Sequence, residues 1–228
     1  MTRTTPDLAR VAGLCAVAAG VLFIAVQINH PVVDLSLVTT PEWTVRQGTK
    51  IVMAVLSLIG ITGMYLRQVR RIGWLGLLGY LLFAMGYLVM LSSEVIGIAV
   101  LPTIAASAPD YVSDVLAAAT SGPVHGDIGL MAPLSSLGGV GFLGGGLVFG
   151  IALARAGVLA RWAAVLLSLG AVATATIPLL PQLNQRLFAI PPSVALIGLG
   201  WSLWRLRPTT PTSEQITDTT SMHPAGLR

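Results

Sequence analysis

Long apolar runs separated by short polar segments dominate this sequence. An apolar helix of about 20 residues crosses the hydrocarbon core of a membrane. Six runs reach or approach that length, and they cover roughly Leu8–Ile28, Trp43–Leu66, Trp74–Leu101, Ile128–Ala154, Trp162–Leu180 and Pro191–Trp204. The pattern predicts an all-α fold, a polytopic transmembrane helix bundle of six spans over residues 1–207.

The basic residues are distributed unevenly between the two sides of this bundle. The connections on one side, with the start of the chain and the end of the sixth run, carry nine: Arg3, Arg10, Arg67, Arg70, Arg71, Arg155, Arg161, Arg205 and Arg207. The alternate connections carry only Arg46, Lys50 and Arg186. Because cytoplasmic connections are enriched in Lys and Arg, we expect a multi-pass protein of the cell membrane with both termini cytoplasmic.

Composition agrees with this class of protein. Of the 228 residues, 54% are hydrophobic and 10% charged, whereas soluble domains average about 25% charged. The net charge of +4 comes with a single lysine and no nucleic-acid-binding motif, so we expect the lipid bilayer and no nucleic acid as partner. The one cysteine, Cys15, excludes an intrachain disulfide. Residues 208–228, rich in Thr, Ser and Pro, are predicted to be a disordered cytoplasmic tail.

The fourth apolar run is rich in glycine. Gly141 and Gly145 form a GxxxG pair, as do Gly146 and Gly150. Small residues at this spacing let helix backbones approach closely in lipid. Three interpretations stay open: a packing seam inside one subunit, a homodimer interface, or a ligand groove.

The long connection between the third and fourth runs contains its own pattern. Residues 110–116 alternate polar and apolar positions as a short amphipathic helix does, and Asp110 is placed to cap it. We expect this helix to lie on the outer surface, as a lid.

Glu94 stands inside the third apolar run. It lies 8 residues before Pro102, or about 12 Å inside the helix end at about 1.5 Å per residue. A carboxylate there is costly unless it is paired, protonated or wetted, and by default it indicates function. One interpretation is an ion pair with Arg46 or Lys50, which lie at similar depth on the second run. The others are a functional carboxyl and simple exposure to solvent.

Other polar residues converge on the same, outer side. They are His30 at the end of the first run, Arg46, Gln47 and Lys50 at the start of the second, and His125 and Asp127 before the fourth. We therefore expect any polar pocket to open outward. His30, Glu94, His125 and Asp127 could supply a metal site, but no spacing motif requires one, and neither a metal nor a cofactor is expected.

Several segments resemble those of a broad group of uncharacterised six-span membrane proteins common in actinobacteria. They are His30-Pro31, Tyr65-Leu66-Arg67-Gln68, Glu94 followed by Val100-Leu101-Pro102 and Ala108-Pro109, and residues 149–162. Together they span most of Val11–Arg161, and the resemblance implies the six-span fold without an activity. A more distant likeness in kind, through Glu94, is to small integral-membrane terpene cyclases, which are short, helical and usually seven-span and depend on intramembrane carboxyl groups.

Three functions fit these residues. The first is an enzyme, cyclase- or isomerase-like, that acts on a lipophilic prenyl- or terpenoid-like molecule by acid-initiated chemistry. Such chemistry needs an acid that stays protonated, which burial in an apolar cavity favours. Glu94 would donate the proton and Asp127 or His125 would orient or reprotonate it. Substrate contacts would come from His30, Arg46, Gln47, Lys50 and Tyr87, and Tyr80, Tyr87 and Phe142 could face a cation.

The second function is a binding or transport protein for a lipid or hydrophobic compound. It uses the same pocket without catalysis, and Glu94 with Lys50 or Arg46 forms a gate. The third is a membrane accessory subunit that docks a partner through its glycine-rich face. Of the three, the sequence favours the enzyme, and the binding or transport protein and the accessory subunit are the alternatives.

Overall fold

The computed structural model describes residues 5–28, 31–120, 122–174 and 186–206. Within these ranges the chain forms helices and no strand, so the all-α prediction is confirmed. The elements are α1 (Thr5–Gln27), α2 (Leu35–Val38), α3 (Pro41–Ala99), α4 (Leu101–Ile104), α5 (Pro109–Ala119), α6 (Met131–Ala156), α7 (Arg161–Thr174), the 3-10 helix η2 (Arg186–Ala189) and α9 (Ile190–Arg205).

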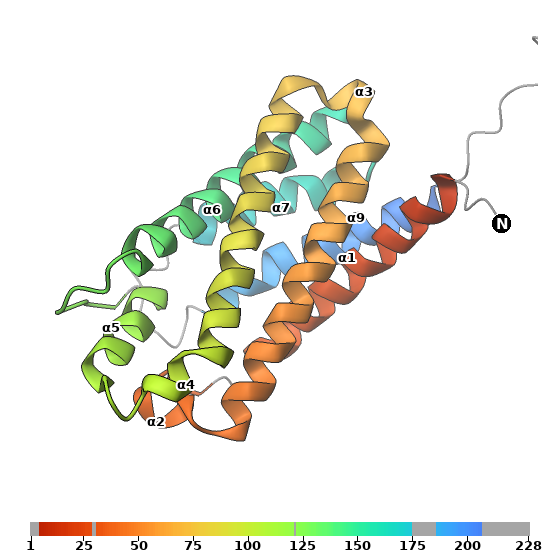
Figure 1. The fold of residues 1–228 in the computed structure, drawn as a ribbon. Coiled ribbons are helices and arrows are strands. Elements are labelled where there is room, and N and C mark those ends of the chain that lie inside the picture. Colours follow the sequence, from red (N-terminus) through yellow and green to blue (C-terminus); the bar gives the residue numbers. More distant parts are fainter. Residues whose placement is uncertain (1–4, 29–30, 121, 175–185, 207–228) are drawn as a thin grey trace, which may run out of the picture.

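Helix α3 is a hairpin made of two antiparallel arms. It rises through residues 41–72, reverses, and returns through residues 74–99 (Figure 1). The reversal occurs at Gly73, whose φ of 63° and ψ of −168° lie in a region that is essentially restricted to glycine. The sequence predicted these two spans but placed a polar loop at Arg67–Arg71. Helical geometry instead continues through the arginines, and a single glycine makes the turn.

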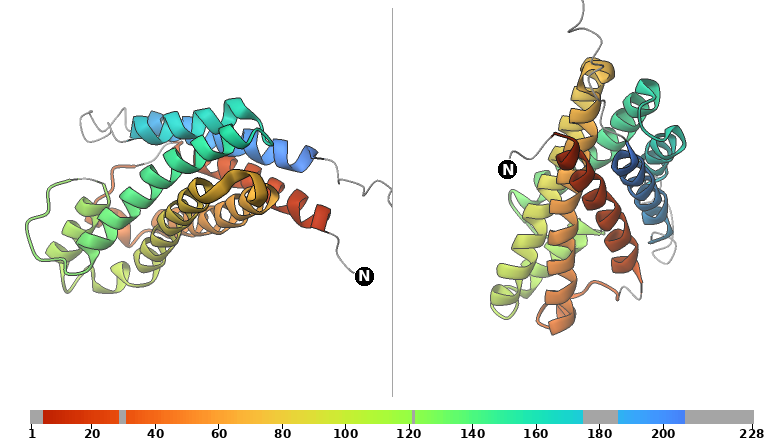
Figure 2. Two further views of the ribbon diagram at one scale, coloured as in Figure 1. Left: turned by 90° about the horizontal axis from the view of Figure 1, so that it is seen from above. Right: turned by 90° about the vertical axis from the view of Figure 1, so that its right-hand side faces the viewer.

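The helices close into one bundle. Helix α1 packs on α3 and α9, α6 packs on α3 and α7, and α7 packs on α9. Seen from above, α7 and α9 lie along one side and α3 along the other, with α1 and α6 between them (Figure 2). The main core, which includes Ile61, Phe83, Tyr87 and Phe149, lies where these helices meet.

The glycines of α6 form a packing seam inside the chain. A Cβ at Gly86 of α3 would lie 2.6 Å from the backbone nitrogen of Phe142, and one at Gly141 would lie 2.8 Å from that of Gly86. Gly145 meets the backbone of Phe83 in the same way. The backbones of α3 and α6 are therefore in direct contact, which confirms the first of the three interpretations for these positions. Homodimerisation through this helix stays a prediction.

Three helices are long and apolar enough to cross a membrane: residues 8–27 of α1, the whole of α3, and α6. The remaining apolar helices are shorter, with 14 residues in α7 and 16 in α9. The predicted fifth span continues past Thr174 into residues outside the described ranges, where His30 and the predicted tail also fall. Large apolar side chains cover much of the outside, among them Val140 and Leu169, which are 63% and 60% exposed.

A smaller unit covers one end of the bundle. We call residues 31–40, 100–120 and 122–130 the outer segment, after the side of the membrane on which the sequence predicts them. Here α2, α4 and α5 surround a second apolar cluster that includes Trp43 and Val112 (Figure 1). Helix α5 confirms the predicted amphipathic helix. The prediction that Asp110 caps it is wrong, because Ala108 is the N-cap residue and Asp110 lies within the first turn.

Candidate functional site

Lys50 and Glu94 form an ion pair between the two arms of α3. The Lys50 Nζ lies 3.4 Å from the Glu94 Oε1, and the two side chains are 21% and 14% exposed. The arms run antiparallel from Gly73, so residues at similar distances from the turn meet at the same depth. Of the two cations that the sequence offered to Glu94, the structure selects Lys50.

Gln47 completes the polar cluster. Its Oε1 accepts a hydrogen bond from the Lys50 Nζ at 3.1 Å, and the residue is 4% exposed. The Glu94 carboxylate faces Gln47 as well as Lys50. One turn further out, the Trp43 Nε1 donates to the Gly97 carbonyl at 2.8 Å. The two arms are thus joined by side-chain hydrogen bonds and an ion pair at their outer ends.

Arg46 serves a different contact. Its guanidinium pairs with Glu42, with the Arg46 Nη2 2.8 Å from the Glu42 Oε1. The Arg46 Nη1 also donates to the Val26 carbonyl at 3.2 Å. Arg46 therefore joins α3 to the end of α1.

Tyr87 lies two helical turns deeper than Glu94, on the same arm. Its side chain is fully buried, and its hydroxyl faces that of Ser57 on the opposite arm. Among the described residues, neither hydroxyl has a hydrogen-bond partner of standard geometry. Buried polar atoms of this kind are uncommon and indicate a ligand, a water or a role in function.

Aromatic rings surround Tyr87. Its ring centroid lies 4.9 Å from that of Phe83 and 5.5 Å from that of Phe142. The Phe142 ring stacks with that of Phe23 of α1, with 6.4 Å between the centroids. Phe149 contacts both Phe83 and Tyr80 and so joins Tyr80 to the same group. The predicted grouping of Tyr80, Tyr87 and Phe142 is thus one connected cluster of rings, placed beneath the Lys50–Glu94 pair.

His125 and Asp127 lie in the outer segment, and both are exposed. The Asp127 Oδ1 accepts a hydrogen bond from the Gly129 backbone nitrogen at 2.8 Å. In the described ranges, no group of three or more His, Cys, Asp or Glu side chains is arranged to hold a metal ion. His30, the last of the predicted binding residues, is outside those ranges.

Asp114 organises this part of the outer segment, and the sequence analysis missed it. Its carboxylate accepts hydrogen bonds from the backbone nitrogens of His125 at 3.0 Å and Gly126 at 2.7 Å. These two bonds hold the pKa of the Asp114 carboxyl below its usual range. The available signal was an acidic residue directly before Val115 and Leu116, on the apolar side of a helix.

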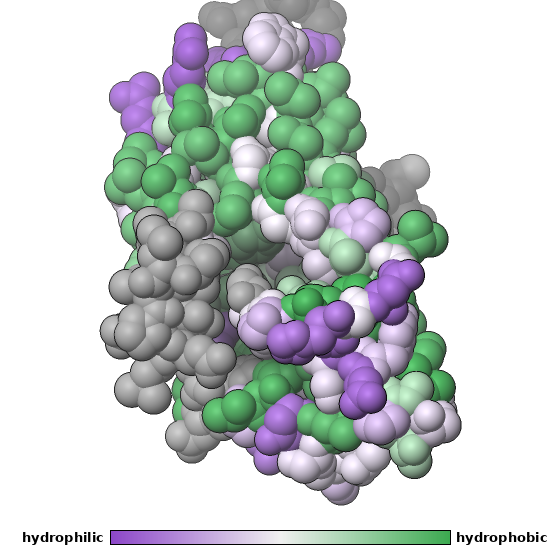
Figure 3. Space-filling view, turned by 90° about the vertical axis from the view of Figure 1, so that its left-hand side faces the viewer, coloured by the Kyte–Doolittle hydropathy of each residue, from purple (hydrophilic) through white to green (hydrophobic). Residues whose placement is uncertain are grey.

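One face of the molecule changes character at this level. Apolar side chains cover much of the upper half of this view, and polar side chains gather in its lower part and again at the top edge (Figure 3).

Comparisons with known proteins identify no relative. No protein-family model, no curated protein and no solved structure matches the chain. The resemblance to six-span membrane proteins accordingly stays a prediction.

Proposed function

We propose that this chain is a six-span protein of the cell membrane, with both termini cytoplasmic, that binds or carries a lipophilic small molecule reached from the outer side. The three long apolar helices and the hairpin form of α3 support a multi-pass arrangement. The nine-to-three distribution of basic residues supports the orientation.

The observation that carries the function is the Lys50–Glu94 pair. Ionised groups inside an apolar body are costly, and they mark substrate or ion pathways by default. This pair lies between two arms of one helix, beside the amide of Gln47. The polar end of a ligand can form hydrogen bonds with Lys50 and Glu94, and these bonds replace the contact between the two side chains. The pair then acts as a gate, and the apolar part of the ligand lies against apolar side chains.

An enzyme that acts on a prenyl- or terpenoid-like molecule is the second candidate. The aromatic cluster around Tyr87 favours it, because the faces of aromatic rings stabilise cations. Glu94 would donate the proton, and His125 or Asp127 would restore it from the outer segment. In the structure Glu94 forms an ion pair with Lys50, so Glu94 can act as a proton donor only after that pair breaks. The binding function requires no such step before the ligand arrives, and we favour it.

Mass spectrometry of the lipids that copurify with the full-length protein tests both functions. Binding predicts a lipophilic compound enriched with the wild type and lost in Glu94→Gln and Lys50→Met. Catalysis predicts a different result for Glu94→Gln, in which an unreacted precursor replaces the compound found with the wild type.

Glu42→Gln is the matched control. It removes a carboxylate from the arm of α3 that carries Lys50, but Glu42 is 52% exposed and pairs with Arg46. Its lipid profile should equal that of the wild type. Identical profiles for the wild type, Glu94→Gln and Lys50→Met would refute both functions at this site.

A further inference from the structure

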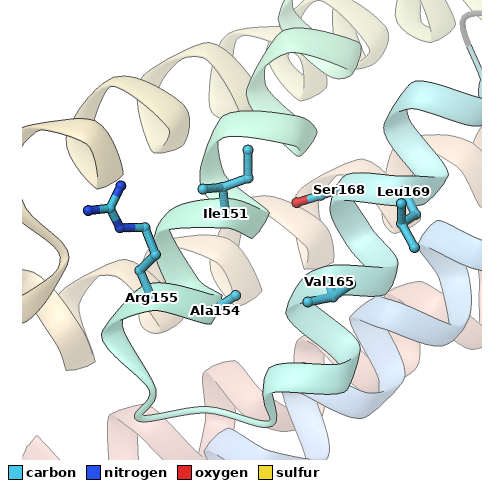
Figure 4. A pocket seen from close by; sticks show the side chains of 6 residues that line it. All are labelled: Ile151, Ala154, Arg155, Val165, Ser168 and Leu169. Carbon is cyan, nitrogen blue, oxygen red and sulfur yellow. The ribbon is translucent and has the colours of Figure 1, made fainter.

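A groove opens between α6 and α7, in the half of the bundle remote from the outer segment. Ile151, Ala154 and Arg155 line it from α6, and Val165, Ser168 and Leu169 line it from α7 (Figure 4). Its volume is about 320 Å³, and it is open on one side. It shares no residue with the Lys50–Glu94 cluster.

The walls of the groove are apolar. The only side-chain hydroxyl in it, that of Ser168, donates to the Leu147 carbonyl of α6 at 3.0 Å. Ile151, Val165 and Leu169 are 40%, 46% and 60% exposed. Water in such a groove finds few partners, whereas a hydrocarbon chain covers the exposed apolar surface at a gain of about 25 cal/mol per Å².

Arg155 provides one charge at the edge of the groove. It lies in the last turn of α6, beside the loop to α7, and its guanidinium extends away from α7 (Figure 4). Over the part of the chain that the structure describes, this guanidinium makes no hydrogen bond or ion pair and is exposed. A guanidinium binds a phosphate through two parallel hydrogen bonds. The side chain of Arg155 borders the groove and its guanidinium lies beyond the edge on the α6 side, so a phosphate bound there would sit next to the groove that its acyl chain enters.

We infer that the α6–α7 groove binds one anionic phospholipid, with an acyl chain against Ile151, Val165 and Leu169 and the phosphate at Arg155. The apolar walls select a hydrocarbon chain, and the unpaired cation selects an anionic head. Arg155 lies on the side that the basic residues predict to be cytoplasmic, where anionic lipids create a negative surface potential. The inference is independent of the proposed function, since it uses neither Lys50 nor Glu94.

Native mass spectrometry of the full-length protein in detergent tests the site. The protein is titrated with phosphatidylglycerol and with phosphatidylcholine carrying the same acyl chains. The wild type should bind phosphatidylglycerol more tightly. Arg155→Gln should weaken phosphatidylglycerol binding about fivefold, the ratio that corresponds to about 1 kcal/mol per basic residue near an anionic lipid surface. It should leave phosphatidylcholine binding unchanged.

Two further variants test the contribution of the acyl chain to binding separately from that of the head group. Ala154→Leu fills the groove and should weaken the binding of both lipids, and Leu169→Trp does the same at a more exposed position if Ala154→Leu lowers stability. Arg10→Gln is the matched control, because Arg10 is an exposed arginine on α1, outside the groove. It should bind both lipids as the wild type does.

Three outcomes would overturn the inference. Equal affinity of the wild type for the two lipids would remove the role of Arg155. If inorganic phosphate displaces phosphatidylglycerol and Ala154→Leu has no effect on binding, the site binds an anion but no acyl chain. A dimer that Ala154→Leu dissociates would make the groove an interface between two copies of this chain.

Discussion

At the scale of single residues, the two ion pairs of α3, one within an arm and one between the arms, differ in their surroundings. Glu42–Arg46 has its carboxylate side chain 52% exposed, whereas Glu94 in the pair with Lys50 is 14% exposed. An exposed pair contributes about 0–1 kcal/mol, because water screens it. Removing one partner of a buried pair costs about 3–5 kcal/mol, because the other charge is left unpaired in a poor solvent. Lys50 and Glu94 should therefore depend on each other for stability.

We predict that Glu94→Gln lowers the free energy of unfolding by about 3–5 kcal/mol, while Glu42→Gln lowers it by less than about 1 kcal/mol. The double variant Glu94→Gln/Lys50→Met should recover most of the loss, because it leaves no unpaired charge. Chemical denaturation of the detergent-solubilised variants measures all three. A stable Glu94→Gln protein would show that Glu94 acts as a protonated acid that does not rely on Lys50.

A second prediction concerns pH and Asp114. The folded-state pKa of this carboxyl is lowered from an unfolded value of about 3.9. Its contribution is therefore fully present above that value and is lost as pH falls through the folded-state pKa. Hydrogen exchange at the His125 and Gly126 amides, corrected for intrinsic rates, should be slow at neutral pH and accelerate below about pH 4.

Asp114→Asn should give fast exchange at one or both amides even at neutral pH, since only one of the two terminal atoms of asparagine accepts a hydrogen bond. Asp110→Asn, on the exposed side of the same helix, serves as the control and should leave exchange unchanged. Slow exchange in Asp114→Asn at neutral pH would show that the carboxylate does not hold the loop.

At the scale of elements, α6 shows how neighbouring glycines acquire different roles. A side chain at Gly145 would run into the backbone of Phe83, and one at Gly146 would approach Ala171 of α7 at 3.2 Å. A Cβ at Gly144 would have no neighbouring atom within 4 Å. Rotation by about 100° per residue along a helix of 3.6 residues per turn places the three on different faces. Only part of the glycine run is therefore required for packing.

We predict opposite effects for two adjacent substitutions. Gly145→Ala should destabilise the protein by about 1–3 kcal/mol, because its methyl group forces α3 and α6 apart. Gly144→Ala should be neutral or stabilising by up to about 1 kcal/mol, because alanine favours the helix over glycine. Melting temperatures of the two purified variants, compared with the wild type, check the pair. Equal melting temperatures would mean that this face of α6 does not pack on α3.

At the scale of the whole molecule, the apolar body and its charged ends define an orientation. Arg155 and Arg161 flank the loop between α6 and α7, and the outer segment lies at the opposite end of α6 (Figure 1). The proposed topology puts the outer segment outside the cell and the α6–α7 loop in the cytoplasm. The two ends should thus differ in their access to a reagent that cannot cross the membrane.

We predict that a membrane-impermeant maleimide labels Ser107→Cys in intact cells and labels Val158→Cys only after permeabilisation. Both changes are made in a Cys15→Ala background, which removes the chain's one cysteine. Leu81→Cys, at a 54% exposed position in the middle of an apolar arm, should stay unlabelled in lipid under both conditions. Labelling of Val158→Cys in intact cells would reverse the orientation.

Much of the helical organisation could be predicted because apolar length and local signals act within a segment. The six apolar runs anticipated α1, the two arms of α3, α6, and the described parts of α7 and α9. The polar-apolar alternation in residues 110–116 anticipated α5. Counting residues on both sides of the α3 turn was enough to place Lys50 and Glu94 at similar depth. The turn itself was misplaced, because arginines resemble a loop in sequence while Gly73 alone permits the required backbone angles.

The sequence by itself determined that the chain is helical, where its apolar segments lie, and that a carboxylate stands within one of them. Tertiary structure alone decided which cation that carboxylate meets. Arg46 and Lys50 are one turn apart and equally available by depth, and only the rotation of each arm about its axis turns Lys50 toward Glu94 and Arg46 toward Glu42 and α1. Asp114 escaped prediction for a related reason, since its partners are backbone groups 11 and 12 residues away. Helix formation depends on neighbours in sequence, whereas these contacts depend on how completed helices and loops face one another.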